Sequence, residues 1–225
     1  DTAYIGKWHL DGHGRHAHIP EERRQGFRFW NTAECDHHYP KSHYYSHEGE
    51  DKRYWQGYDA YDQTRAARSY LEERSRVQEA PFFLMISYGG PHFPHETAPD
   101  DLQAHYPPGQ IQLRPNVPDR MQGRARREAQ GYYAHCEAID RCIGELLDTL
   151  EERGLAENTI VVFTSDHGEM MGSHGVPPKQ KQVPWDESAI VPFLIRGPGV
   201  EGGRAVDTPI NTPDIFPTLA GLVGL

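Results

Sequence analysis

One short segment of the chain, TSDHGEMMGSHG, crowds together residue types that bind cations and transfer protons. Asp166 and His167 are adjacent in it, and Glu169 and His174 follow a few positions later. The apolar run Thr159–Phe163 that precedes them predicts a buried strand. A polar turn would explain one or two of these residues, but open α/β folds bind ligands at the carboxyl ends of their strands. The segment therefore indicates a site as well as a turn.

Three further polar clusters adjoin predicted strands. They are Lys7 and His9 after residues 2–5, His92 and His95 after residues 81–88, and Lys179, Lys181, Asp186 and Glu187 before residues 190–196. A single lysine is usually a solvated charge, and a single histidine is usually a hydrogen-bonded structural residue. If all these residues were only structural, the position of all four clusters next to strands would be a coincidence. We therefore expect all four clusters to meet at one edge of one sheet.

The residue types in these clusters suit a tetrahedral oxyanion, either sulfate or phosphate. Asp166 and His167 offer an oxygen and a nitrogen to a divalent cation. Such a cation, together with lysines, offsets charge that develops on the anion's oxygens, and an imidazole can protonate a leaving alcohol. The positive or donor groups are Lys7, His9, His92 and Lys181. No GxxxxGK[ST] phosphate loop is present, which argues against a nucleotide kinase or an ATPase.

The composition narrows the class of protein. The chain has 225 residues, enough for one large domain or two small ones, and 18 prolines and 22 glycines indicate many loops. Its formal net charge of −10 argues against nucleic-acid binding, although a locally basic pocket can still accept an anion. No run of about 20 apolar residues is present to span a membrane. The three cysteines form no CxxC motif, which argues against a zinc knuckle or a thioredoxin motif.

The elements that must position these groups alternate between strands and helices. Helices are predicted over residues 62–78, 131–150 and 212–222. Thr212 is the expected N-cap of the last helix. Residues 11–60 show no clear periodicity apart from a short ordered piece, RRQGFRFW, and residues 97–121 predict a proline-rich surface excursion. The alternation predicts a mostly parallel sheet covered on both faces, without an internal domain boundary.

Five segments carry a resemblance to a known family. They are YIGKWHL, ISYGGPHFPH, AIDRCIGELLDTLEERGLAENTIVVFTSDHGEMMGSHG, KQVPWDESAIVPFLIRGPGV and TPDIFPTLAGLVGL. In this order they resemble the type I sulfatases of the alkaline phosphatase superfamily. The resemblance implies an α/β, alkaline-phosphatase-like three-layer sandwich with a mostly parallel, mixed central sheet. Residues 1–225 would form a partial sulfatase catalytic domain, incomplete at the N-terminus.

The resemblance also implies catalytic roles for individual residues. Lys7 and His9 would contact the sulfate and the reactive nucleophile. His92 would stand beside the ester oxygen of the leaving group, and Lys181 would reach a sulfate oxygen. Lys179, two positions earlier, would be a solvated charge.

A cation site and a pocket wall follow from the same resemblance. Asp166 and His167 would bind the cation, where many relatives have Asp-Asn. We expect calcium, although a histidine ligand also suits Mn²⁺ or Zn²⁺. His95 and His174 would line the substrate pocket, and Glu169 would support its loop through hydrogen bonds.

The nucleophile of the family is a formylglycine made from Cys or Ser in a C/S-x-P-x-R motif. Neither the cysteines nor the serines of this chain stand in that motif, and the early Asp-Asp pair of the metal site is also missing. Both features precede GKWHL in the family, so we expect them upstream of Asp1. The alternative is a degenerate homologue without catalysis.

Three functions follow from these observations. The first is hydrolysis of sulfate esters on a sulfated small molecule or polysaccharide, whose sugar rings could stack on the aromatic residues of segment 11–60. The second is a phosphonate or phosphate diester hydrolase, which the Asp-His pair favours. The third is a non-catalytic module that binds sulfated glycans. Family analogy predicts a periplasmic or secreted protein, or a lysosomal one in a eukaryote. The 225 residues alone are expected to be inactive.

Overall fold

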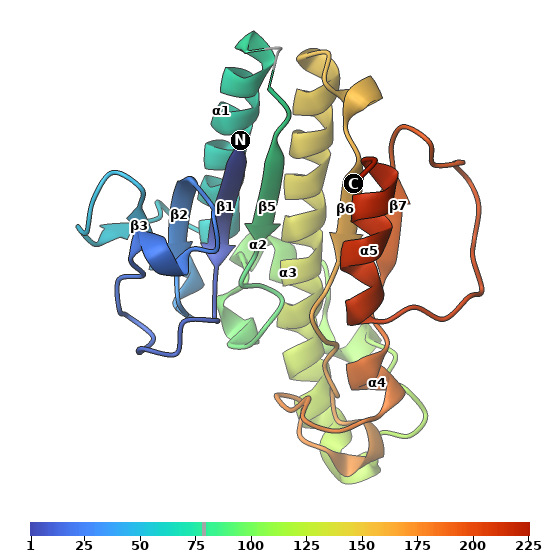
Figure 1. The fold of residues 1–225 in the computed structure, drawn as a ribbon. Coiled ribbons are helices and arrows are strands. Elements are labelled where there is room, and N and C mark those ends of the chain that lie inside the picture. Colours follow the sequence, from blue (N-terminus) through green and yellow to red (C-terminus); the bar gives the residue numbers. More distant parts are fainter. Residues whose placement is uncertain (78–79) are drawn as a thin grey trace.

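The computed structural model describes residues 1–77 and 80–225 (Figure 1). Its larger sheet has five strands in the order β4-β3-β2-β1-β5. They are β1 (Thr2–Lys7), β2 (Phe29–Ala33), β3 (His43–Ser46), β4 (Arg53–Tyr54) and β5 (Phe83–Ser87). Strand β1 pairs in parallel with β2 and β5, whereas β3 pairs antiparallel with β2 and β4. The mixed sheet with helices confirms the predicted α/β class.

A second sheet contains β6 (Val161–Thr164) and β7 (Phe193–Arg196), which run antiparallel. Within the described part of the chain, these two strands hydrogen-bond only to each other. The expectation that all four polar clusters share one edge of one sheet is therefore wrong. Strands β1, β5 and β6 nevertheless point the same way in Figure 1, so their carboxyl ends lie at the same end of the molecule.

The helices are α1 (Asp59–Arg76), α2 (Asp100–Gln103), α3 (Asp119–Glu152), α4 (Asp186–Ala189) and α5 (Thr212–Leu222). Short 3₁₀ turns occur at Glu21–Arg23, Tyr39–Lys41, His95–Thr97, Pro108–Gln110, Ala156–Asn158 and Ser173–Gly175. Helix α1 packs against α3 and touches β1 and β5, while α2 also packs on α3. In the described ranges, no helix is both long and apolar enough to cross a membrane.

Two predicted helices have different bounds in the structure. Helix α1 ends at Arg76, and the predicted end at Gln78 lies outside the described residues. Helix α3 begins at Asp119 rather than near Gly131. A Cβ at Gly131 would lie 2.1 Å from the carbonyl oxygen of His95, so this glycine permits a close approach inside the helix instead of marking its start.

The two segments predicted to be irregular are more ordered than expected. Residues 11–60 contribute strands β2, β3 and β4, and Trp30 on β2 is fully buried. The Trp30 ring meets Trp8 edge-on with ring centroids 5.0 Å apart, and Tyr4 meets Trp8 at the same distance. Residues 97–121 include buried Leu102 on α2 and the first residues of α3. Aromatic and aliphatic packing thus orders both segments without a periodic sequence pattern.

The last helix is capped one residue earlier than predicted. Asn211, not Thr212, is the N-cap of α5, and its side chain and that of Asp214 form a reciprocal capping box. The N–H of Asn211 donates to the Asp214 carboxylate at 2.8 Å. Thr212 occupies the first helical position instead. No residue of α5 is buried.

Candidate functional site

The carboxyl ends of β1 and β2 hold Lys7 and His9 in place. Gly6 has φ = +106°, and a Cβ there would come within 2.2 Å of the Ser87 carbonyl oxygen on β5. Only glycine fits this close contact between β1 and β5. Beyond the strands, the His9 N–H donates to the Glu34 carbonyl at 2.9 Å, which keeps this edge paired. Lys7 and His9 therefore stand on a rigid support.

His92 follows β5 with its ring orientation fixed by the backbone. Its Nδ1 lies 2.7 Å from the carbonyl oxygen of Phe93, so Nδ1–H donates there and Nε2 is left for proton transfer. Burial lowers the pKa of His92 to about 3. The charges of Lys181 and Lys7 contribute to this lowering, while the bond to Phe93 opposes it. His92 is thus neutral at neutral pH.

Asp166 and His167 follow β6 and present an oxygen and a nitrogen side by side. His167 Nδ1 lies 2.8 Å from the Gly168 carbonyl oxygen, and Nε2 lies 3.3 Å from Asp166 Oδ2. Two ligands of one cation at about 2.0–2.5 Å from it lie roughly this far apart. A Cβ at Gly168 would lie 2.1 Å from the Glu187 carbonyl oxygen, so glycine lets the loop approach the start of α4. The pair fits a divalent cation.

Lys181 lies in the loop before α4, and its ammonium group has no ordinary partner. Its Nζ is buried without a hydrogen bond among the described residues, and it stands 5.1 Å from the centroid of the Phe93 ring. Burial lowers the pKa of Lys181, while the carboxylate of Glu169 opposes that change. A buried cation without an acceptor is unfavourable, and a bound anion would remove the penalty.

The expectation that Glu169 supports its loop through side-chain hydrogen bonds stays a prediction. The Glu169 Oε1 is buried and has no hydrogen-bond partner in the described part of the chain. Burial raises the pKa of Glu169 to about 7, and the charge of Lys181 works against this rise. When ionised, this carboxylate raises the pKa of Lys181.

Groups from four distant parts of the sequence converge in this way. The rings of His92 and His167 have centroids 6.4 Å apart. Lys7 and Lys181 both lower the pKa of His92, and Lys7 and Asp166 both act on Lys181. The structure thus brings cationic and imidazole groups around a single location, next to an oxygen–nitrogen pair.

Two other residues predicted for this region have different neighbours. His95 is buried, and its Nδ1 lies 2.8 Å from a carboxylate oxygen of Glu128. Lys179, expected to be solvated, pairs with Glu128 at 3.4 Å and with Glu96 at 3.5 Å. The partly buried Glu128 carboxylate attracts the ammonium group into this network. The predicted pocket-wall role of His95 stays a prediction.

His174 lies in a separate group of contacts. Its ring stacks on Trp185 with centroids 4.3 Å apart and an interplanar angle of 18°. Its Nε2 is 3.0 Å from the side-chain nitrogen of Asn116 and 3.6 Å from a carboxylate oxygen of Glu187. These contacts connect the loop after β6 with the segment before α3 and the start of α4. Substrate binding by His174 stays a prediction too.

His37 was missed by the sequence interpretation. It lies in the loop after β2, and its ring centroid is 4.5 Å from that of His92. The signal was present, because ECDHH directly follows the strand FWNTA. Recognising that strand as a parallel neighbour of β1 would have placed His37 at the same edge of the sheet.

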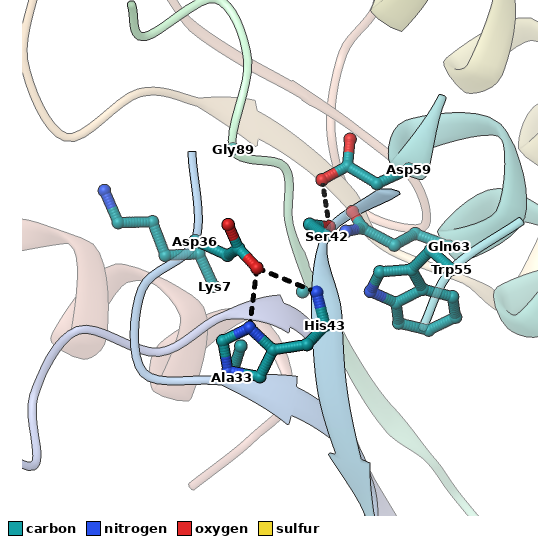
Figure 2. A pocket seen from close by; sticks show the side chains of 10 residues that line it. Lys7, Ala33, Asp36, Ser42, His43, Trp55, Asp59, Gln63 and Gly89 are labelled. Carbon is teal, nitrogen blue, oxygen red and sulfur yellow. Dashed lines mark hydrogen bonds and ion pairs between the residues drawn. The ribbon is translucent and has the colours of Figure 1, made fainter. Parts of the chain in front are cut away.

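The pocket beneath this loop is shown in Figure 2. The Asp36 carboxylate accepts hydrogen bonds from the backbone N–H of His43 at 2.9 Å and from its ring Nδ1 at 2.6 Å. Ser42 donates to the buried carboxylate of Asp59 at 2.7 Å. Lys7 lines the same pocket, so the hydrogen-bonded base of the loop adjoins the site.

Comparison with known proteins assigns this arrangement to a family. The sequence profile of the sulfatase family matches residues 1–225. An ulvan-active sulfatase from Formosa agariphila is 50% identical over 99% of this chain and 44% of its own length. An endo-4-O-sulfatase from Bacteroides thetaiotaomicron is 32% identical over 100% of this chain and 48% of its own length. The chain therefore belongs to the sulfatase family.

The fold agrees with that assignment. A solved Bacteroides fragilis structure described as a sulfatase superposes with a TM-score of 0.90 at 28% identity, covering 99% of this chain and 52% of that one. The chain spans about half the length of the curated relatives it matches. Members of the family generally use a metal ion and a formylglycine.

Proposed function

We propose that the protein containing this chain hydrolyses sulfate esters on a sulfated polysaccharide. The observation that carries the proposal is the buried Lys181 ammonium group, which has no acceptor among the described residues and shares its surroundings with Lys7 and a neutral His92. The Lys181 ammonium group lacks a hydrogen-bond acceptor among the described residues, and a sulfate oxygen would supply one. The ulvan-active and endo-4-O-sulfatase relatives support a glycan as the carrier of that sulfate.

In this proposal each residue has a distinct task. Lys7 and Lys181 offset negative charge on the sulfate oxygens. His92 Nε2 delivers a proton to the departing sugar oxygen while the sulfur–oxygen bond breaks. His9 contacts the sulfate and the nucleophile. Water is consumed overall, and the products are the free sugar hydroxyl and sulfate with one proton released.

Binding of sulfate would change the pKa of His92. In the free protein, burial holds the pKa of His92 at about 3, so it carries no proton to donate at neutral pH. A sulfate between the lysines would neutralise the charges that lower this pKa and would favour the protonated ring. The anion would thus raise the pKa of His92 by removing the smaller, charge-based part of the shift, while burial supplies the larger part.

The proposal also includes a divalent cation and a formylglycine nucleophile. Asp166 and His167 would hold the divalent cation, which polarises sulfate oxygens when bound. We propose calcium, with Mn²⁺ and Zn²⁺ as the alternatives that a histidine ligand permits. A formylglycine from another part of the protein would supply the nucleophile. His95 and His174 complete the proposed pocket wall, and a polymeric substrate favours a periplasmic or secreted enzyme.

The test is an assay of the complete protein, purified from cells that make formylglycine. Sulfate release from sulfated polysaccharides and aryl sulfates is compared with hydrolysis of aryl phosphonates and phosphodiesters. We expect a preference for sulfate esters, and a strong preference for the phosphorus esters would overturn the proposal. If the protein binds sulfated glycan without releasing sulfate, it is a binding module instead.

Variants of the complete protein test the proton donor. His92→Ala should lower kcat by about 10²–10⁴-fold, the usual contribution of a general acid. His105→Ala is the matched control, because His105 is an exposed imidazole that pairs with Glu137 on α3. The control should retain the activity of the natural protein.

A further inference from the structure

The loop between β2 and β3 places a second imidazole against His92. The His37 ring lies 4.5 Å from the His92 ring at an interplanar angle of 36°, and it meets the Phe93 ring edge-on at 5.6 Å. None of the roles assigned above uses His37. Its nearness to the proposed proton donor raises the question of what it does in the reaction.

The structure fixes His37 through its neighbours in the chain. Asp36 accepts the backbone N–H of His38 at 2.9 Å as well as the two bonds from His43, so the peptide around residue 37 is tied down. Tyr39 is fully buried, and its hydroxyl donates to the Gly89 carbonyl oxygen at 3.1 Å. These contacts join the loop to β3 on one side and to the end of β5 on the other. They hold the backbone around His37 in place.

The charges around His37 define its chemical character. Burial lowers the pKa of His37 to about 4, and the positive charges of Lys7, Arg15 and Lys181 add to the effect. A neutral imidazole offers one donor and one acceptor. Its Nε2 lies 3.3 Å from the Cys35 sulfur. Within the described residues, no hydrogen bond engages its Nδ1, so this nitrogen is available to a ligand.

We propose that His37 determines substrate specificity by hydrogen-bonding a sugar hydroxyl next to the sulfate ester. The assignment rests on the proposed function, because it takes His92 as the group beside the departing sugar oxygen. A hydroxyl can donate to or accept from the remaining ring nitrogen Nδ1, whereas the lysines and the cation pair already serve the sulfate. His37 stands beside His92, and for this reason we assign its hydrogen bond to the sugar that carries the departing oxygen.

The experiment compares two substrates of the complete protein. His37→Ala should lower kcat/KM about 10- to 100-fold more on a sulfated oligosaccharide than on 4-nitrophenyl sulfate, which has no neighbouring hydroxyl. His37→Asn, whose amide nitrogen can replace Nδ1, should recover part of the loss. His38→Ala is the matched control, since this adjacent imidazole is exposed and should leave both rates unchanged.

Each other outcome overturns the assignment. An equal loss on both substrates would mean that His37 acts on the sulfate or on His92, and no loss on either would mean that it only packs the loop. Thermal unfolding of His37→Ala must match the natural protein, and His37→Asn keeps the comparison valid if the alanine variant is unstable. A natural protein that releases sulfate from neither substrate refutes the proposed function itself, and the assignment with it.

Discussion

Strand β1 of the larger sheet and strands β6 and β7 of the smaller one all contain apolar residues, but they are buried to very different extents. Four consecutive residues of β1, from Ala3 to Gly6, are buried between neighbours. By contrast, no residue of β6 or β7 is fully buried, and the Leu194 side chain on β7 is 60% exposed. Burial therefore depends on what packs around a strand and not on the strand's own residues. The chain spans about half the length of its relatives, so the complete protein can test what covers β6 and β7.

The residues of the candidate site also differ in how deeply they are buried. The region around the five-stranded sheet contributes His37 and His92, two half-buried imidazoles with lowered pKa values. The region after β6 contributes Asp166, whose side chain is 80% exposed. Packing lowers the pKa of both imidazoles, while the Asp166 carboxylate is exposed to solvent.

The largest expected difference is in hydrogen exchange. In the 225-residue chain, β1 amides should exchange roughly a thousandfold more slowly than β7 amides, because β1 opens only with its core and β7 opens locally. Mass spectrometry of exchanged peptides measures both strands in one sample. The same experiment on the complete protein should narrow the difference. Equal protection in the short chain would show that β7 is as well packed as β1.

Two matched strand substitutions, one in the core and one at the surface, should give the next largest effect, on the free energy of unfolding. Ile5→Ala removes a fully buried side chain and should lower the free energy of unfolding by about 2–5 kcal/mol. Leu194→Ala removes an exposed side chain and should change it by less than about 0.5 kcal/mol. Urea unfolding of both variants of the 225-residue chain checks the pair. A large loss for Leu194→Ala would contradict the contrast.

The two regions should also respond to pH with opposite signs. Burial lowers the pKa of His135 on α3 from 6.5 to about 4, so the folded form binds fewer protons and stability falls as the pH drops through that window. Burial raises the pKa of Glu169 from 4.5 to about 7, so its contribution is complete below pH 4.5 and is lost as the pH rises through 7. Each slope reaches about 1.4 kcal/mol per pH unit at most.

Two non-titrating variants separate these slopes. His135→Gln should flatten the acid side of the stability profile, and Glu169→Gln should flatten the decline between pH 4.5 and 7. Chemical unfolding at a series of pH values gives both profiles. A variant whose profile runs parallel to that of the natural chain would show that its group does not titrate as described.

The smallest expected effect concerns the cap of α5. Asn211→Ala should destabilise this helix by about 0.5–2 kcal/mol, because it removes half of the capping box. Thr212→Ala, one residue on, should change it by only a few tenths of a kcal/mol. Amide exchange in the first turn of α5 compares the two. If Thr212→Ala destabilised the helix more than Asn211→Ala did, Thr212 would be the N-cap, as predicted from the sequence.

Long apolar or amphipathic runs were predictable from the sequence, and short aromatic strands were not. Strands β1, β5 and β6 and much of α3 follow a local hydrophobic pattern, which can be recognised in a single sequence. Strands β2 and β3 consist of polar and aromatic residues whose burial comes from contacts such as that of Trp30 with Trp8. The missed strand β2 is also why His37 went unrecognised, since its place depends on parallel pairing with β1.

Residue types and their order are local properties, so they were enough to assign the family and to select Lys7, His92, Asp166 and Lys181. Distances between remote segments are not local. Only folding decided that His37 stands against His92, that the Lys181 ammonium group is buried without an acceptor among the described residues, and that β6 pairs with β7 in a separate sheet. The physical reason is that burial and charge act through space, and they change the pKa of a side chain according to its neighbours in three dimensions.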